Sequence, residues 1–177
     1  MRILLYGVPG SGKTTISGLL AQEHGLRLVS GDYLRDVAKT EHTKDEDPFA
    51  YTGTCQAWAE FGALTPEHAT KGLRAVRKSM QPYVVAAITS NPDCIFEVAF
   101  LDPHDYLDTA QLYLITTPDE QRHRKQFFQE RMITNDTTSE FTASRLVQDY
   151  LISEAKALNV PIIVNDGVSS LLLEQFK

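Results

Sequence analysis

Cysteine is scarce in this chain: Cys55 and Cys94 are the two present among 177 residues. Their positions match no metal-ligand spacing, and two cysteines offer no framework of several disulfides. The five histidines are scattered and form no HExxH pattern. Neither a disulfide-stapled secreted domain nor a zinc peptidase is indicated.

Basic residues do not outnumber acidic ones. Lysine and arginine number 17 against 23 aspartates and glutamates, for a formal net charge of −6, which argues against binding nucleic acid mainly through phosphate contacts. No apolar run approaches the roughly 20 residues of a membrane span, and the first apolar stretch is too short for a signal peptide. We therefore expect a cytoplasmic protein, a monomer or homodimer, with no nucleic-acid or membrane partner.

What the chain does have is a complete phosphate-binding motif near its start. Residues 7–14 read Gly-Val-Pro-Gly-Ser-Gly-Lys-Thr, the Walker A pattern, between the apolar run 3–6 and a helical pattern over 13–24. Glycines allow successive N–H groups to point into one concavity, and the N-terminus of the following helix favours an anion there. The motif predicts binding of the β- and γ-phosphates of a nucleoside triphosphate, which we expect to be ATP.

The motif also predicts individual roles. Lys13 is expected to place a positive charge on the β- and γ-phosphates, the Thr14 hydroxyl to bind Mg²⁺, and Thr15 to reach the α-phosphate. Asn165, after the last predicted strand, is expected either to hold adenine or to form a turn. The residues expected to bind the nucleotide are Gly7, Pro9, Gly10, Ser11, Gly12, Lys13, Thr14, Thr15 and Asn165.

Strand-like and helix-like segments alternate along the chain. Strands are expected at 2–6, 26–29, 94–98, 112–115 and 160–164, and helices at 13–24, 31–38, 54–61, 66–90, 118–132, 142–157 and 168–176. Pro82 is expected to kink or divide the segment 66–90, and 39–47 to form a surface loop. The alternation predicts one α/β domain with a parallel sheet, whose ligands lie at the carboxyl ends of the strands.

Two acidic residues stand at such strand ends. Asp32 follows the second strand, where it can hold the hydroxyl of a phosphoryl acceptor or cap the next helix. Glu97 closes a buried strand, where a carboxylate is costly without a cation, so it is a candidate for Mg²⁺. Asp102 is its competitor for the metal, with a turn before Pro103 as the alternative role.

Basic residues offer candidate contacts to an acidic acceptor. Arg35 lies about one helical turn after Asp32 and can grip a phosphate or carboxylate. Lys71 and Arg74 share a helix face with Lys78, which favours substrate recognition and a solvated basic stripe about equally. Asp32, Arg35, Lys71 and Arg74 are therefore the expected substrate-binding residues.

Two groups of residues carry a family resemblance. The Walker A motif followed by Gly31-Asp32-x-x-Arg35 resembles the nucleoside-monophosphate-kinase group of P-loop kinases. The segments 95–103, 145–151 and 160–165 resemble archaeal 2-phosphoglycerate kinases, some of whose relatives are thought to act on mevalonate 3-phosphate. Val98 stands where that family has a glycine.

The resemblance implies a three-layer fold with a five-stranded parallel sheet of order 2-3-1-4-5. It implies a single domain over 1–177, with an acceptor-binding helical insert at about 39–90 and a lid at about 119–141. It also implies transfer of the γ-phosphoryl group of ATP, with Mg²⁺, to a hydroxyl of a small phosphorylated hydroxy acid.

In this kinase group, lid arginines close over the phosphates. Arg131, beside the polar stretch 134–138, is the first candidate for that catalytic role and Arg122 the second, with a solvated helix face as the alternative. Arg145 and Asp149 are spaced as an ion pair that supports a helix. Two other functions stay open: a nucleoside monophosphate kinase, and a slow ATPase that acts as a switch or assembly factor.

Overall fold

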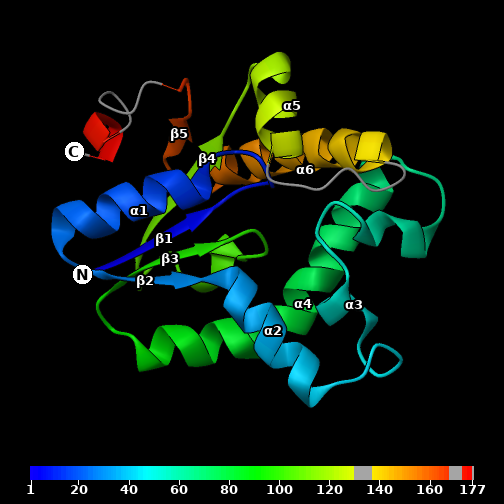
Figure 1. The fold of residues 1–177 in the computed structure, drawn as a ribbon, viewed down its shortest axis with the longest axis horizontal. Helices are drawn as coiled ribbons and strands as arrows, with labels where there is room; N and C mark the ends of the chain where they lie inside the picture. Colours follow the sequence, from blue (N-terminus) through cyan, green and yellow to red (C-terminus); the bar gives the residue numbers. More distant parts are fainter. Residues whose placement is uncertain (130–136, 168–172, 177) are drawn as a thin grey trace.

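A five-stranded parallel sheet forms the centre of the computed structural model, which describes residues 1–129, 137–167 and 173–176 (Figure 1). The strand order is β2-β3-β1-β4-β5, and every neighbouring pair is parallel. The strands are β1 (Arg2–Tyr6), β2 (Arg27–Ser30), β3 (Cys94–Val98), β4 (Gln111–Thr116) and β5 (Ile162–Val164). The predicted fold class and strand order are confirmed.

Helices and short helical turns connect the strands. The described helices are α1 (Lys13–His24), α2 (Gly31–Glu41), α3 (Pro48–Tyr51), α4 (Pro66–Ser90), α5 (Glu120–Gln129) and α6 (Thr137–Ala157). The 3₁₀ turns are η1 (Ala57–Phe61), η2 (Pro103–Asp105) and η3 (Leu173–Phe176). Helix α2 takes in the first three residues of the expected loop 39–47 and ends where the His42 amide donates to the Ala38 carbonyl. Within the described ranges, no helix is both long and apolar enough to cross a membrane.

The two faces of the sheet build two apolar cores. Side chains of a strand alternate between faces, so in β1 Ile3 and Leu5 join one core, and Leu4 and Tyr6 join the other. Ile16 and Leu20 of α1 cover the smaller core. Residues of α2, α4 and α6 cover the larger one. This is the three-layer arrangement expected of a parallel sheet buried on both sides.

Helix α4 is one 25-residue helix with Pro82 inside it, so of the two expected effects of Pro82, division of the helix does not occur. A proline cannot donate to the carbonyl four residues earlier, here that of Lys78. Both residues are exposed, and on that side of the helix solvent can supply the missing donor. The opposite side buries Leu73, Val76 and Met80 in the larger core, so α4 belongs to the layer that covers the sheet.

The start of α4 and the end of α1 follow the predicted signals. Thr65 caps α4 by accepting a hydrogen bond from the His68 amide at 3.1 Å, and Pro66 is the first helical residue. Gly25 ends α1 in the left-handed region, at φ 63°. Of the expected helix 168–176, the described part is the turn η3, which sets Phe176 against Tyr113 with ring centroids 4.6 Å apart.

Candidate active site

The Walker A segment forms a tight loop between β1 and α1. Gly10 and Gly12 have φ angles of 77° and 87°, which side chains other than glycine rarely adopt. The Ser11 amide donates to the Val8 carbonyl at 3.2 Å, and the Lys13 ammonium donates to the same carbonyl at 2.9 Å. Among the described residues, the buried Ser11 hydroxyl is one of the few polar groups without a hydrogen-bond partner. The loop thus carries the positive-φ turns and the cation that a phosphate group requires.

A cavity of about 240 Å³ lies beside this loop at the carboxyl ends of β1, β2 and β3. Lys13 and Thr14 line it from the start of α1, Asp32 from the start of α2, and Glu97 from the end of β3. Four of the predicted functional residues therefore meet in one place, although they come from three distant segments of the chain.

Glu97 is held against the Walker A threonine. Parallel pairing sets it beside Ser30 of β2, whose hydroxyl donates to it at 3.2 Å. The Thr14 hydroxyl lies 3.3 and 3.4 Å from the two Glu97 carboxylate oxygens, and the Glu97 side chain is buried. Hydroxyl and carboxylate oxygens are the hard donors that Mg²⁺ prefers, so this pair fits the expected metal.

Asp102 lies elsewhere. Its carboxylate accepts hydrogen bonds from the backbone and ring of His104, at 3.1 and 2.9 Å, and lies 3.9 Å from Arg77. Asp102 therefore caps the turn η2, as the alternative role required. Of the two candidates for the metal, the fold brings Glu97 and not Asp102 to Thr14.

Asp32 is exposed at the mouth of the cavity. Ser30, not Asp32, caps helix α2, because the Asp32 amide donates to the Ser30 hydroxyl at 3.3 Å. The alternative reading of Asp32 as the helix cap is therefore wrong. The carboxylate is left to face the space in front of the loop.

Arg35 is hydrogen-bonded to the backbone around helix α3. One of its guanidinium nitrogens donates to the carbonyls of Phe49, Ala50 and Thr52, at 3.3, 3.1 and 2.8 Å. The group also lies over the ring of Phe100, 5.1 Å from its centroid. In this structure Arg35 joins α2 to the segment around α3, and its contact with a substrate stays a prediction.

The other basic candidates lie outside this cavity or outside the described residues. Lys71 pairs with Glu67 on the surface of α4 at 2.7 Å. Arg74 lies over the ring of Tyr150 and lines a second cavity, considered below. Arg122 is exposed on α5, where a side chain at Gly167 would collide with it. Arg131 falls outside the described residues, so its expected lid role stays a prediction.

A layer of polar residues behind the loop was not anticipated as such. The Asn165 amide nitrogen donates to the Ser11 carbonyl at 3.0 Å, and its oxygen accepts from the Gly167 amide at 3.1 Å. The Thr117 hydroxyl donates to the same Ser11 carbonyl at 3.3 Å. Both ends of the Asn165 amide are thus engaged in holding the loop and forming a turn, the second of its two predicted roles. Its expected contact with adenine stays a prediction.

Arg145 belongs to the same supporting layer. Its guanidinium donates to the carbonyls of Thr117 and Pro118 at 3.0 and 3.1 Å, and lies 3.3 Å from Nδ1 of His123. The ion pair with Asp149 is not among the salt bridges of the described residues, so that expectation was wrong. An ion pair with the exposed Asp149 carboxylate would add little stability, and the Arg145 guanidinium instead binds the carbonyls of the turn at Thr117 and Pro118.

His123 connects this layer to the Walker A loop. Because Arg145 can only donate, Nδ1 of His123 accepts, and Nε2 carries the proton that it donates to the Pro9 carbonyl at 2.9 Å. The ring is fully buried. Burial lowers the pKa of His123, and the nearby positive charges of Arg145 and Lys13 lower it further.

The lowered pKa of His123 predicts a stability that falls in mild acid. As pH drops through about 6.5, His123 of the unfolded chain takes up a proton, whereas buried His123 of the folded protein stays neutral. The contribution of His123 to the free energy of unfolding is therefore complete above that pH and is lost below it. We expect His123→Gln, which keeps a donor for Pro9, to reduce the decrease in Tm between pH 7.5 and 5.5. Scanning calorimetry of both proteins across this range is the measurement, and parallel curves would contradict the prediction.

Comparisons with known proteins agree with the geometry at the start of the chain. Residues 6–53 match a family model described as an AAA domain. A 42-residue stretch is 45% identical to the adenylate kinase of Salinibacter ruber, and covers 23% of this chain and 20% of that one. A 65-residue stretch is 38% identical to the cytidylate kinase of Methanosarcina barkeri, and covers 36% of this chain and 29% of that one. The matched segments thus span less than a third of either curated relative.

Solved structures resemble the whole chain. TT1252 from Thermus thermophilus has a TM-score of 0.58 at 17% identity, with 99% of this chain and 91% of that one covered. The shikimate kinase of Acinetobacter baumannii has a TM-score of 0.56 at 14% identity, with 99% and 89% covered. At these identities the likeness shows the fold alone.

Proposed function

We propose that the chain is an ATP-dependent kinase that transfers the γ-phosphoryl group to a hydroxyl of a small phosphorylated hydroxy acid. The observation that carries the proposal is the meeting of Lys13, Thr14, Asp32 and Glu97 around one cavity. Phosphoryl transfer needs positioning and neutralisation of charge more than covalent chemistry from the protein. This set of residues supplies a cation, a metal-binding oxygen pair and a carboxylate for the acceptor.

In the proposed reaction each residue has a separate task. The loop amides and Lys13 hold the β- and γ-phosphates and offset the charge of the transferred group. Asp32 accepts a hydrogen bond from the acceptor hydroxyl and receives its proton as the oxygen bonds to the γ-phosphorus and ADP leaves. Thr14 and Glu97 would hold Mg²⁺, directly or through water, and the ion would neutralise phosphate charge.

The size and lining of the cavity support a small acceptor. At about 240 Å³ it lies below the roughly 300–1,000 Å³ typical of drug-sized ligand sites. No aromatic residue lines it among those that the structure describes, so it offers no platform on which a second nucleobase would stack. A phosphorylated hydroxy acid such as 2-phosphoglycerate or mevalonate 3-phosphate needs neither the volume nor the platform.

A nucleoside monophosphate kinase is the second candidate. The observation that favours it is the local identity to an adenylate kinase and a cytidylate kinase. The adenylate kinase stretch covers a fifth of that protein, so the shared sequence need not extend to a second nucleotide site.

The two candidates are separated by an ADP-release assay with MgATP and a panel of acceptors. The panel contains 2-phosphoglycerate, mevalonate 3-phosphate, mevalonate, AMP and CMP. We expect a phosphorylated hydroxy acid to stimulate ADP release at least about tenfold over hydrolysis without acceptor. Lys13→Ala protein prepared in the same way controls for contaminating kinases.

Each outcome of the panel assigns the chain to one class. Stimulation by AMP or CMP alone would replace the proposed acceptor by a nucleotide. Slow ATP hydrolysis that no acceptor changes would instead favour a nucleotide-dependent switch.

A further inference from the structure

A second cavity, of about 180 Å³, lies between α4 and the connection from β3 to β4. The segment that follows β3 runs along both cavities: Glu97 to Ala99 line the first, and Phe100 to Tyr106 help to line the second. Arg74, Arg77 and Lys78 line the second cavity from α4. We refer to it as the α4 cavity.

Three cations, Arg74, Arg77 and Lys78, and two carboxylates, Asp102 and Asp105, line the cavity. Arg74 and Lys78 are exposed, and neither has a carboxylate within salt-bridge distance in the described parts of the chain. The two acidic residues that line the cavity already have partners. Asp102 is bound by His104, and Asp105 accepts a hydrogen bond from Gln81 at 2.9 Å. An anion is therefore the ligand that the exposed cations favour.

Two buried donors on the wall find no partner among the described residues. Nε of Arg77 and the hydroxyl of Tyr106 make no hydrogen bond there, although the two residues are 5% and 6% exposed. An unsatisfied buried polar group lowers stability, so such groups are rare in folded proteins. A bound ion or ligand that completes the missing hydrogen bond is one explanation of their presence. Burial, together with the negative charges of Asp105 and Asp102, raises the pKa of Tyr106 to about 12, and its hydroxyl therefore keeps the proton that it would donate.

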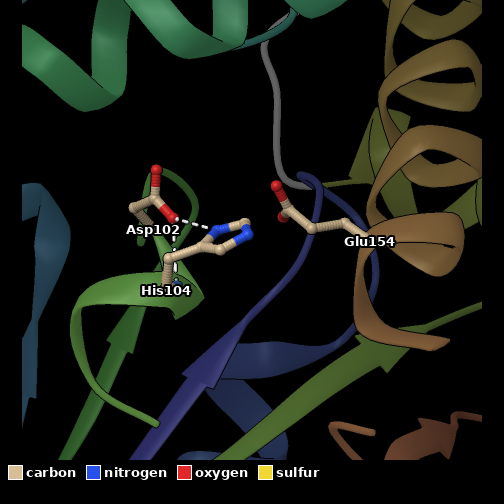
Figure 2. A group of neighbouring side chains, drawn as sticks. All are labelled: Asp102, His104 and Glu154. Carbon is tan, nitrogen blue, oxygen red and sulfur yellow. Dashed lines mark hydrogen bonds and ion pairs between the residues drawn. The ribbon is translucent and has the colours of Figure 1, made fainter. Parts of the chain in front are cut away.

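The neighbouring acidic cluster does not form a metal site. Asp102, His104 and Glu154 present ligand atoms within 4.8 Å of one another (Figure 2). However, both oxygens of Glu154 accept hydrogen bonds from the guanidinium of Arg77, at 2.9 and 2.7 Å. The positive charge that Glu154 requires is thus already supplied by the protein, and this cluster holds Arg77 in position beneath the cavity.

We propose that the α4 cavity binds the phosphate or carboxylate group of the acceptor, an inference that rests on the proposed function. Tyr106 and Nε of Arg77 donate hydrogen bonds to its oxygens, and Arg74 and Lys78 offset its charge. The acceptor would then lie along the segment 97–106, with its anionic end in this cavity and its hydroxyl toward Asp32.

Direct binding tests the inference without turnover. The full-length protein is first saturated with a non-hydrolysable ATP analogue and Mg²⁺, so that the Walker A loop cannot take up the probe. Calorimetric titration with 2-phosphoglycerate, and separately with mevalonate 3-phosphate and inorganic phosphate, then gives each dissociation constant. We expect Tyr106→Phe to weaken binding of a phosphorylated acid about tenfold, and Lys78→Ala to weaken it several-fold.

Two matched variants provide controls. Tyr6→Phe removes a second buried tyrosine hydroxyl that has no partner among the described residues, and Tyr6 does not line the cavity. Lys44→Ala removes the same charge as Lys78→Ala, from an exposed turn. We expect both controls to bind the probe within twofold of the parent protein. Because each tyrosine change removes an unsatisfied hydroxyl, neither variant should have a lower Tm than the parent. A loss of binding in Tyr106→Phe would then not result from unfolding.

The outcomes keep this inference separate from the proposed function. If a phosphorylated acid binds equally well to Tyr106→Phe, to Lys78→Ala and to the parent, the α4 cavity is not its site, whereas the proposed acceptor class stands. If neither acid binds the parent but AMP stimulates ADP release, the acceptor class itself is wrong. Inorganic phosphate that binds as tightly as the acids, with the same loss in Tyr106→Phe, would make the cavity a site for free phosphate and overturn its acceptor role.

Discussion

Replacing Lys13 by alanine is expected to lower kcat/KM for phosphoryl transfer by about 10³-fold while the protein stays folded. The ammonium is the cation that the Walker A loop places toward the phosphates, and no other lysine or arginine lines that cavity among the described residues. In the folded protein Lys13 donates to the Val8 carbonyl of its own loop, so its loss removes a hydrogen bond worth about 1 kcal/mol. Steady-state ADP release and thermal unfolding of the variant measure the two effects.

A surface lysine gives the matched control for this experiment. Lys44→Ala removes the same charge from an exposed turn and should leave kcat/KM unchanged. Activity of Lys13→Ala near that of the parent would remove the central assignment of the site. An unfolded variant would show that the lysine is needed for the loop itself, and Lys13→Met, which keeps the aliphatic stem, would then be the variant to assay.

The largest loss of stability is expected from breaking the buried ion pair between α4 and α6. Arg77 and Glu154 form two hydrogen bonds at 2.9 and 2.7 Å, and their side chains are 4% and 5% exposed. Arg77→Met would leave the Glu154 carboxylate buried without its cation. We expect this change to lower the free energy of unfolding by about 3–5 kcal/mol, measured by urea denaturation at neutral pH.

The double variant Arg77→Met/Glu154→Leu separates the pair from its parts. The free energy needed to desolvate two charges nearly offsets the attraction between them. Apolar residues of similar size should therefore recover most of the lost stability. Tyr150 donates to Glu154 at 2.7 Å and would lose that partner, which leaves a smaller residual cost. A double variant no more stable than Arg77→Met would show that Arg77 acts through contacts other than Glu154.

The same pair explains why a stability measurement must accompany any functional test on α4. Arg77 both neutralises Glu154 and lines the α4 cavity, so a variant at this position changes folding and binding together. Lys78 and Tyr106 line the cavity without such a partner, and their variants report on binding alone.

Val98 stands directly after Glu97, where the 2-phosphoglycerate kinases that the sequence resembles have glycine. Here the Val98 side chain occupies the space that a Cβ at Gly31 would need. Because Gly31 has no side chain, Val98 fits beside it, and Glu97 at the end of β3 still lines the cavity. Gly31→Ala should therefore disturb the start of α2, next to Asp32.

Local features of the sequence determined the strands, most helix ends and the phosphate-binding loop. Short apolar runs specified strands such as 2–6 and 94–98, and Gly25 and Thr65 marked helix ends, because these signals act over a few neighbouring residues. The Walker A spacing placed Lys13 and Thr14 without reference to the rest of the chain. The strand order came from the resemblance to a kinase family, and the sheet confirms it.

Which side chains meet was decided by the tertiary structure. Glu97 and Asp102 look alike in sequence, but parallel pairing with β2 fixes Glu97 beside Ser30 and Thr14, whereas the chain turns at Asp102 and carries it to Arg77. The spacing of Arg145 and Asp149 suggested an ion pair, yet Arg145 reaches carbonyls 27 and 28 residues away. Contacts between distant segments depend on how the helices pack on the sheet. The spacing of residues within one helix or strand does not show which residues of another element they will contact.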